Sequence, residues 1–215
     1  MFQIYKIRWF NRFNEYCILR DGDNAFYIEK GFSRKWINES DENHNSSGIS
    51  ILWPDINNHY FKEELEKIEN KKSDSPNNIS PIIKYSLKNG ATVLWFGDLE
   101  NDFLDKIKDN VEFSNVDIIF APHHGRKTGK IPKSVLDKIC PKLIIIGEAE
   151  SPHLDYYDGY DTITQNTAKN IVLNCGLGEV DIYTDYEFNQ HYLKQKNKKY
   201  YCETGEKYRG TLELN

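Results

Sequence analysis

Two short stretches of this sequence contain side chains of the types needed for metal or acid–base chemistry. Asp98 follows the apolar run at residues 93–97. His123 and His124 follow a second apolar run, residues 116–122. Carboxylate oxygens and imidazole nitrogens are ligands that Zn, Mn and Fe take in proteins. If the two stretches meet in space, the sequence predicts a metal site.

The elements that must position these groups are two strands and a helix. Both apolar runs are rich in β-branched or aromatic residues, which is typical of a strand buried on both faces. Residues 101–110, between the runs, have apolar side chains at helical spacing. In a layered α/β fold this order brings Asp98 and the two histidines onto neighbouring loops at one edge of the sheet.

Asp98 has a second interpretation, because Asp is a good N-cap for the helix predicted after it. The paired histidines favour the metal interpretation, since adjacent side chains point in different directions and packing would explain only one of them. Nearby, Arg126 and Lys127 either contact phosphate electrostatically or are ordinary surface charges. His153 is a further candidate for contact with substrate.

The rest of the chain has patterns of both helix and strand. Apolar spacing and proline positions predict helices at residues 60–72, 132–139 and 162–169. Runs of β-branched and aromatic residues predict strands at residues 2–10, 49–54, 143–147, 171–174, 179–184 and 186–193. Turn residues predict hairpins from residues 15–20 with 25–29, and from residues 81–87 with 91–96. The second hairpin turns at Asn89-Gly90, where both residues are expected to have positive φ.

Composition and charge restrict the class of protein. The chain has 215 residues, 39% of them hydrophobic and 28% charged, which fits a globular protein of one domain or slightly more. The formal charge of −5 gives no global basic field for nucleic acid. Four widely spaced cysteines without a Cys-x-x-Cys pair indicate reduced thiols. With no signal peptide and no apolar run of membrane-spanning length, we expect a cytoplasmic protein without a membrane segment.

Three motifs, taken in order, resemble the metallo-β-lactamase superfamily, and most nearly its ComEC-like competence-protein hydrolase branch. They are residues 78–80 (Asn-Ile-Ser), 95–98 (Trp-Phe-Gly-Asp) and 122–125 (Pro-His-His-Gly). The resemblance covers roughly residues 45–185. The first metal motif of the superfamily, His-x-(His/Asp)-x-Asp-His, does not occur in this sequence.

The resemblance therefore implies the C-terminal half of that fold. The expected fold class is α/β, with partial metallo-β-lactamase-like αββα layers, a mixed sheet with flanking helices, and added N-terminal β-hairpins. We expect a β-rich N-terminal segment at residues 1–60, the metallo-β-lactamase-like half at 61–195, and a polar C-terminal tail at 196–215.

The resemblance also implies roles for single residues. Asp98 would bridge two Zn or Mn ions, and His124 would ligate the second. His123 would lie beside the site as a general acid or a phosphate contact, although the two histidines can exchange these roles. Asn78 falls near the position of a histidine ligand in some relatives, where it would form hydrogen bonds instead of holding zinc. Such ions produce hydroxide near neutral pH and clamp the oxygens of a phosphoester.

The expected function is a metal-dependent hydrolase that acts on phosphoesters, in the manner of a phosphoesterase or nuclease. Asp98 and His124 supply fewer ligands than a binuclear site needs. Activity would therefore depend on a missing N-terminal half, supplied by another polypeptide or by an upstream piece of a longer gene. A half-fold would also expose an apolar sheet face, which predicts a homodimer or an obligate partner. The alternative is a pseudoenzyme, a catalytically inactive interaction or regulatory module that kept the scaffold. Metal content separates the two.

Overall fold

The computed structural model describes most of the chain from residue 46 onward. The described residues are 28–33, 40, 46–70, 72, 75–149, 151–198 and 205–214, with the side chains of 151, 153 and 154 excepted. The strand predicted at 2–10 and most of the hairpin predicted at 15–29 lie outside these residues. No helix in the described part is both long and apolar enough to cross a membrane.

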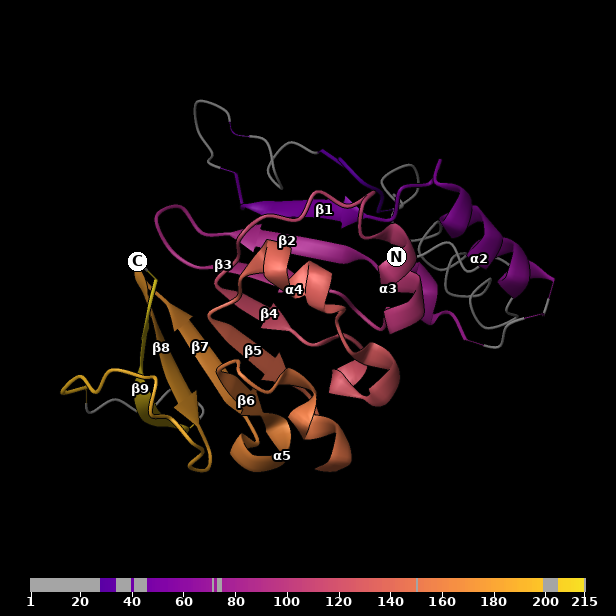
Figure 1. Cartoon of the computed structure of the whole chain (residues 1–215). Helices are drawn as coiled ribbons and strands as arrows, with labels where there is room; N and C mark the ends of the chain where they lie inside the picture. The colour runs from indigo at the N-terminus through magenta and orange to yellow at the C-terminus, as the bar shows by residue number, and fades with distance from the viewer. Residues whose placement is uncertain are drawn as a thin grey trace.

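Six strands form a mixed sheet in the order β1-β2-β3-β4-β5-β6 (Figure 1). Their bounds are β1 (Ile49–Trp53), β2 (Ile82–Ser86), β3 (Thr92–Trp95), β4 (Ile118–Phe120), β5 (Leu143–Ile146) and β6 (Thr162–Thr164). The pairs β1–β2 and β2–β3 are antiparallel, and β3 to β6 are parallel. The carboxyl ends of β3, β4 and β5 therefore meet at one edge of the sheet.

Helices cover one face of this sheet and a second sheet covers part of the other (Figure 1). The second sheet is antiparallel, in the order β7 (Ile171–Cys175), β8 (Glu179–Thr184) and β9 (Lys207–Glu213). The helices on the first of these faces are α2 (His59–Glu69), α3 (Asn101–Ile107) and α4 (Lys133–Ile139). The short α5 (Gln165–Ala168) packs its Ala168 in the core between the sheets. The α/β fold class expected from the sequence is confirmed, as a mixed sheet with flanking helices and a further antiparallel sheet.

Alternate residues of the central strands belong to two different cores. Val93 and Ile118 pack in the core between the sheets, whereas their chain neighbours Leu94 and Ile119 pack in the core beneath the helices. Ile118 and Ile119 are both fully buried. Burial on both faces explains why these strands are apolar throughout instead of alternating with polar residues.

The structure differs from the sequence prediction at β6 and after β8. Residues 162–164 form an edge strand paired with β5, and only residues 165–168 are helical where a longer helix was predicted. Residues 186–193, predicted as a strand, have no strand structure. Phe188 and Leu193 nevertheless pack on the core between the sheets. The apolar spacing of residues 186–193 therefore reflects the burial of an irregular connection and not the pairing of a strand.

The turn of the hairpin between β2 and β3 also differs from expectation. Asn89 has a φ of 58°, as predicted, but Gly90 does not have positive φ. The Gly90 N–H donates to the Leu87 carbonyl at 3.0 Å, and the Leu87 N–H donates to the Ala91 carbonyl at 3.0 Å. The connection is therefore wider than a two-residue turn, which needs positive φ at both central residues.

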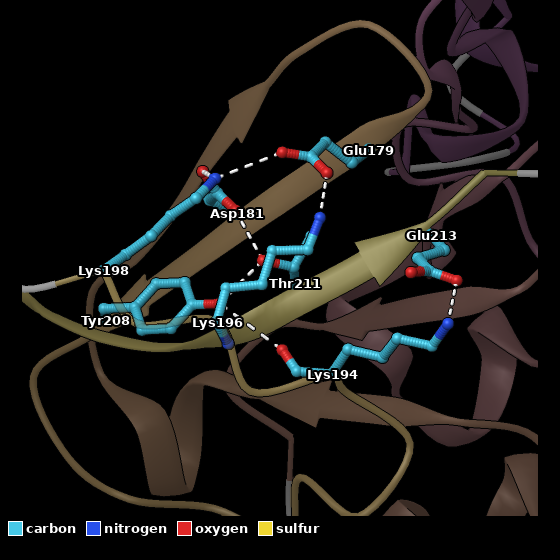
Figure 2. Close-up of polar contacts among 8 residues, drawn as sticks. All are labelled: Glu179, Asp181, Lys194, Lys196, Lys198, Tyr208, Thr211 and Glu213. Carbon is cyan, nitrogen blue, oxygen red and sulfur yellow. Dashed lines mark hydrogen bonds and ion pairs between the residues drawn. The ribbon is translucent and has the colours of Figure 1, made fainter.

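The basic run at residues 194–198 lies along the face of β8 and β9 that points away from the first sheet (Figure 2). Lys196 and Lys198 both form ion pairs with Glu179. Lys198 also pairs with Asp181, at 2.5 Å, and the side chain of Asp181 is 9% exposed. We call residues 194–198 the lysine strap. It is a paired element of the structure and not the solvated turn that its composition indicates.

Candidate functional site

Asp98 and His124 line the same cavity, at the edge where β3 and β4 end. The cavity has a volume of about 290 Å³. We call it the Asp98–His124 cavity. The N-cap residue of α3 is Glu100, so the alternative in which Asp98 caps this helix is wrong. Neither the Asp98 carboxylate nor the His124 ring makes a hydrogen bond or an ion pair within the described residues.

The turn that carries the histidines has an uncommon backbone. His123 has φ 46° and ψ 45°, His124 has φ 60° and ψ 12°, and Gly125 has φ 82°. Left-handed conformation at a residue with a Cβ costs on the order of 1–3 kcal/mol and is concentrated at functional sites. Two consecutive histidines in this conformation therefore destabilise the fold, which supports a functional role for their side chains.

The left-handed turn sends the two imidazole rings to different surroundings. Their centroids are 6.4 Å apart and their planes are inclined at 54°. His123 Nδ1 lies 2.9 Å from the Thr128 hydroxyl, and the His123 N–H donates to the Gly97 carbonyl at 3.0 Å. His124 is the histidine that lines the cavity with Asp98. The divergence expected for paired histidines is present.

Hydrogen bonds from residues 77–80 hold the loop that carries Asp98. The Ser80 hydroxyl accepts from the Asp98 N–H at 3.1 Å, and the Asn78 side-chain oxygen accepts from the Glu100 N–H at 3.2 Å. Asn77 donates its amide to the Glu100 carboxylate at 3.0 Å. Asn78 also donates to the buried Glu64 of α2, at 3.3 Å. The Asn-Ile-Ser motif therefore positions Asp98, and Asn78 acts as a hydrogen-bonding residue.

Two glycines allow other segments to approach the histidine turn closely. A Cβ on Gly147, directly after β5, would lie 3.0 Å from the Cβ and 3.1 Å from the Cα of His124. A Cβ on Gly129 would lie 2.1 Å from the Pro122 carbonyl oxygen, which is a severe clash with backbone. Glycine at these positions therefore determines where the His124 side chain can lie, and the sequence contains no motif that marks it.

A second cavity, of about 560 Å³, adjoins the other side of the histidine turn. Lys127, Thr128 and Lys130 contribute to its wall, as do the acidic Glu100 and Asp102. Its charge is therefore mixed and not uniformly basic. Lys127 lies in the wall of this cavity, and its contact with substrate stays a prediction.

Of the remaining predicted substrate contacts, Arg126 and His153, only Arg126 has a described side chain. Arg126 is exposed, and only its backbone N–H bonds to the histidine turn, donating to the His123 carbonyl at 3.1 Å. The side chain of His153 lies outside the described residues.

Tyr157 anchors the basic loop from below. Its hydroxyl donates to the Gly129 carbonyl at 3.2 Å and accepts from the Ile131 N–H at 3.3 Å. Burial raises the pKa of the Tyr157 hydroxyl, and the backbone hydrogen bond from Ile131 opposes this in part. The hydroxyl therefore stays neutral and serves as a fixed structural contact.

The donor atoms of the site fit a metal in type but not in number. Carboxylate oxygen and imidazole nitrogen match Zn or Mn. Within the part of the chain that the structure describes, no group of three or more His, Cys, Asp or Glu side chains is arranged to hold a metal ion. Asp98 and His124 would need further donors from outside the described residues.

An aromatic pair, not singled out from the sequence, forms part of the same cavity. Trp95 and Phe120 are register partners on β3 and β4, and their rings stack with centroids 5.2 Å apart and planes inclined at 13°. Each ring precedes its candidate ligand by a few residues. The signal was present in the sequence as aromatic residues near both strand ends, but only the strand register brings them together.

Comparison with known proteins gives no match: neither protein-family models nor curated proteins match this chain. A fold class alone does not identify an activity. The function is therefore inferred from the chemistry of the site.

Proposed function

We propose that this chain is part of a divalent-metal-dependent phosphoester hydrolase, related to the ComEC-like branch of the metallo-β-lactamase superfamily. Asp98 and His124 bind the metal in this proposal, and His123 lies beside it. The observation that carries the proposal is the shared cavity at the carboxyl edge of the sheet, where these two side chains have no other described partner.

The layering of the chain also supports the proposal. The order of strand, Gly-Asp, helix, strand and His-His corresponds to β3, residues 97–98, α3, β4 and residues 122–125. Helices on one face of the mixed sheet and a second sheet on the other agree with part of an αββα arrangement.

The chain's own residues would divide the work as follows. The Asp98 carboxylate and the His124 imidazole would hold a Zn or Mn ion, which would supply an activated water and neutralise phosphoester oxygens. Thr128 orients the His123 ring through Nδ1, which leaves Nε2 as the nitrogen that can exchange a proton with the leaving oxygen. Lys127 attracts the anionic substrate from the adjoining cavity.

Asp98 and His124 supply too few metal ligands, so the proposal includes a second source of ligands. The further ligands come from residues outside the described part of this chain, or from another polypeptide that supplies the missing half.

The test is metal content together with cleavage of bis(p-nitrophenyl) phosphate by the full chain. We expect bound Zn or Mn by plasma mass spectrometry, and Mn- or Zn-dependent cleavage. Asp98→Ala and His124→Ala should each lower metal content and reduce cleavage at least tenfold, since each removes one of few ligands. His59→Ala, which changes an exposed histidine at the start of α2, is the matched control and should leave both unchanged.

A folded protein that binds neither Zn nor Mn, even weakly and with the metal in excess, would contradict the proposal. That result would return the inactive interaction module as the function. Equal metal content in wild type and Asp98→Ala would also contradict it, because the ion would then lie elsewhere.

A further inference from the structure

The Asp98–His124 cavity has an apolar wall that metal binding does not use. Trp95 and Phe120 stack there as a nearly parallel pair, and neither ring is fully buried. Ile145 of β5 and Ile171 of β7 continue this wall from the two sheets. Large aromatic surface that is exposed to water in a cavity is unfavourable, which indicates that a ligand covers it.

Polar groups lie on the other walls of the same cavity. Asp98 and His124 lie at the strand ends, and Gln165 contributes from the start of α5. An apolar wall with a few convergent polar groups is the usual composition of a small-molecule site. The volume of about 290 Å³ is at the lower end for such sites. It suits one ring with its attached ester and excludes a duplex.

We propose that the Trp95–Phe120 wall binds a nucleobase, so that the substrate of this site is a nucleotide or the end of a single strand and not a simple alkyl phosphoester. The inference rests on the proposed function for the position of the ester, which lies beside Asp98 and His124. The base lies flat against the aromatic pair, and the Gln165 amide hydrogen-bonds its edge.

A nucleobase fits this wall for three physical reasons. It is flat, so it can continue the parallel stack of the two side chains. Its edge offers donors and acceptors that an amide side chain can pair with. It is carried on a phosphoester, so one molecule reaches both walls. Stacking tolerates every base, so the wall selects for a base without selecting which one.

The test compares two ligands that differ only in the base. Adenosine 5′-monophosphate and ribose 5-phosphate are titrated into the full chain in the presence of a chelator, and binding is followed by calorimetry. We expect the nucleotide to bind at least tenfold more tightly, as one stacked base is worth roughly this much. The indole N–H resonance of Trp95 should shift with the nucleotide and not with the sugar phosphate.

Two variants and one control show which side chains produce the preference for the nucleotide over the sugar phosphate. Trp95→Leu and Phe120→Leu keep an apolar side chain but remove the flat ring, and each should reduce the preference at least tenfold. Phe120→Leu is the smaller change and covers the case in which Trp95→Leu fails to fold. Tyr186→Leu removes an aromatic ring that is 62% exposed and is not part of this cavity, and it should keep the preference.

Equal affinity for the two ligands, including no binding of either, would overturn the inference. So would a preference that survives in both leucine variants. Asp98→Asn separates this inference from the proposed function, because it removes a metal ligand and leaves the aromatic wall. If Asp98→Asn and wild type both prefer the nucleotide while neither binds metal, the base site stands and the hydrolase does not. Metal-dependent cleavage without any base preference would support the hydrolase and contradict the base site.

Discussion

At the scale of single residues, the backbone conformation of His124 lowers the stability of the fold, which points to a functional role for its side chain. Its side chain is exposed and makes no described hydrogen bond, so it adds little to folding. Its φ of 60° adds a cost that glycine would avoid. A residue that lowers stability and contacts little is typical of a functional site.

His124→Gly should therefore stabilise the metal-free chain. Relief of the left-handed conformation is worth about 1–2 kcal/mol, and the extra chain entropy of glycine offsets about 0.5–1 kcal/mol of it. The expected net gain in the free energy of unfolding lies between about 0 and 1.5 kcal/mol, measured by urea unfolding in the presence of a chelator.

His59→Gly is the matched control, because His59 is an exposed histidine with helical backbone in α2. It should lower stability by about 0.5–1 kcal/mol. A loss of stability in both variants would mean that the His124 side chain makes a stabilising contact.

The sequence indicates which residues carry chemistry but not which of two adjacent ones faces the cavity. Asp98 and His124 could be selected because carboxylate and imidazole follow strands. The division between His123 and His124 depends on φ values near 50°, which neither residue type requires. Gly147 and Gly129 could not be recognised, since their roles depend on contacts with residues distant in sequence.

At the scale of elements, the lysine strap shows how charge spacing holds an outer face. Lys196 and Lys198 converge on Glu179, and Asp181 accepts from both Lys198 and the buried Thr211 (Figure 2). These hydrogen bonds, first that from Lys196 and then that from Lys198, lower the pKa of Glu179 below its ordinary value of 4.5. Hydrogen bonding to Asp181 similarly raises the pKa of Lys198.

The strap contacts should weaken in acid. Because folding lowers the pKa of Glu179, its contribution to stability is present above the ordinary glutamate pKa and is lost as the pH falls through the folded-state pKa. Glu179→Gln should therefore lower the urea midpoint at pH 7, and the difference from wild type should shrink as the pH falls below 4.5. High salt should shrink it too, since these groups are partly exposed.

Glu66→Gln is the control for this series, because Glu66 is an exposed carboxylate on α2. Its difference from wild type should be smaller at pH 7. A Glu179→Gln effect that is equal at neutral and acid pH would show that the strap is held by packing instead of charge.

Element type was predictable where burial and sequence pattern agree. α2, α3, α4 and the central strands follow their apolar spacing, since their buried residues are the ones that the pattern marks. β6 was not predictable, because three residues acquire strand geometry only by pairing with β5. At residues 186–193 the pattern predicted a strand that does not form. Phe188 and Leu193 pack on the core from an irregular connection.

At the scale of the whole molecule, the six-stranded sheet separates two cores that share its strands. Trp53 lies in the core beneath the helices and Trp95 packs against the core between the sheets. Because adjacent residues such as Ile118 and Ile119 belong to different cores, neither core can be lost without disrupting the strand that both use. We expect the two cores to unfold together.

Ile118→Val and Ile119→Val test this expectation, as each removes one methylene from one core. Each should lower the free energy of unfolding by about 0.5–1.5 kcal/mol. In both variants the indole resonances of Trp53 and Trp95 should vanish at the same urea concentration, because a shared strand makes the transition cooperative. Separate midpoints for the two indoles would mean that the layers are independent.

The two sheets are joined at both ends, in different ways. Far from the cavity, the Gly178 N–H donates to the Asn89 carbonyl at 3.0 Å, beside a bridge between Gly90 and Leu177. At the opposite end, β7 begins at Ile171, on the cavity wall. The chain crosses from one sheet to the other at this end, from β6 through α5 to β7, so any change in the spacing of the sheets here would move Gln165 and Ile171 relative to Trp95 and Phe120.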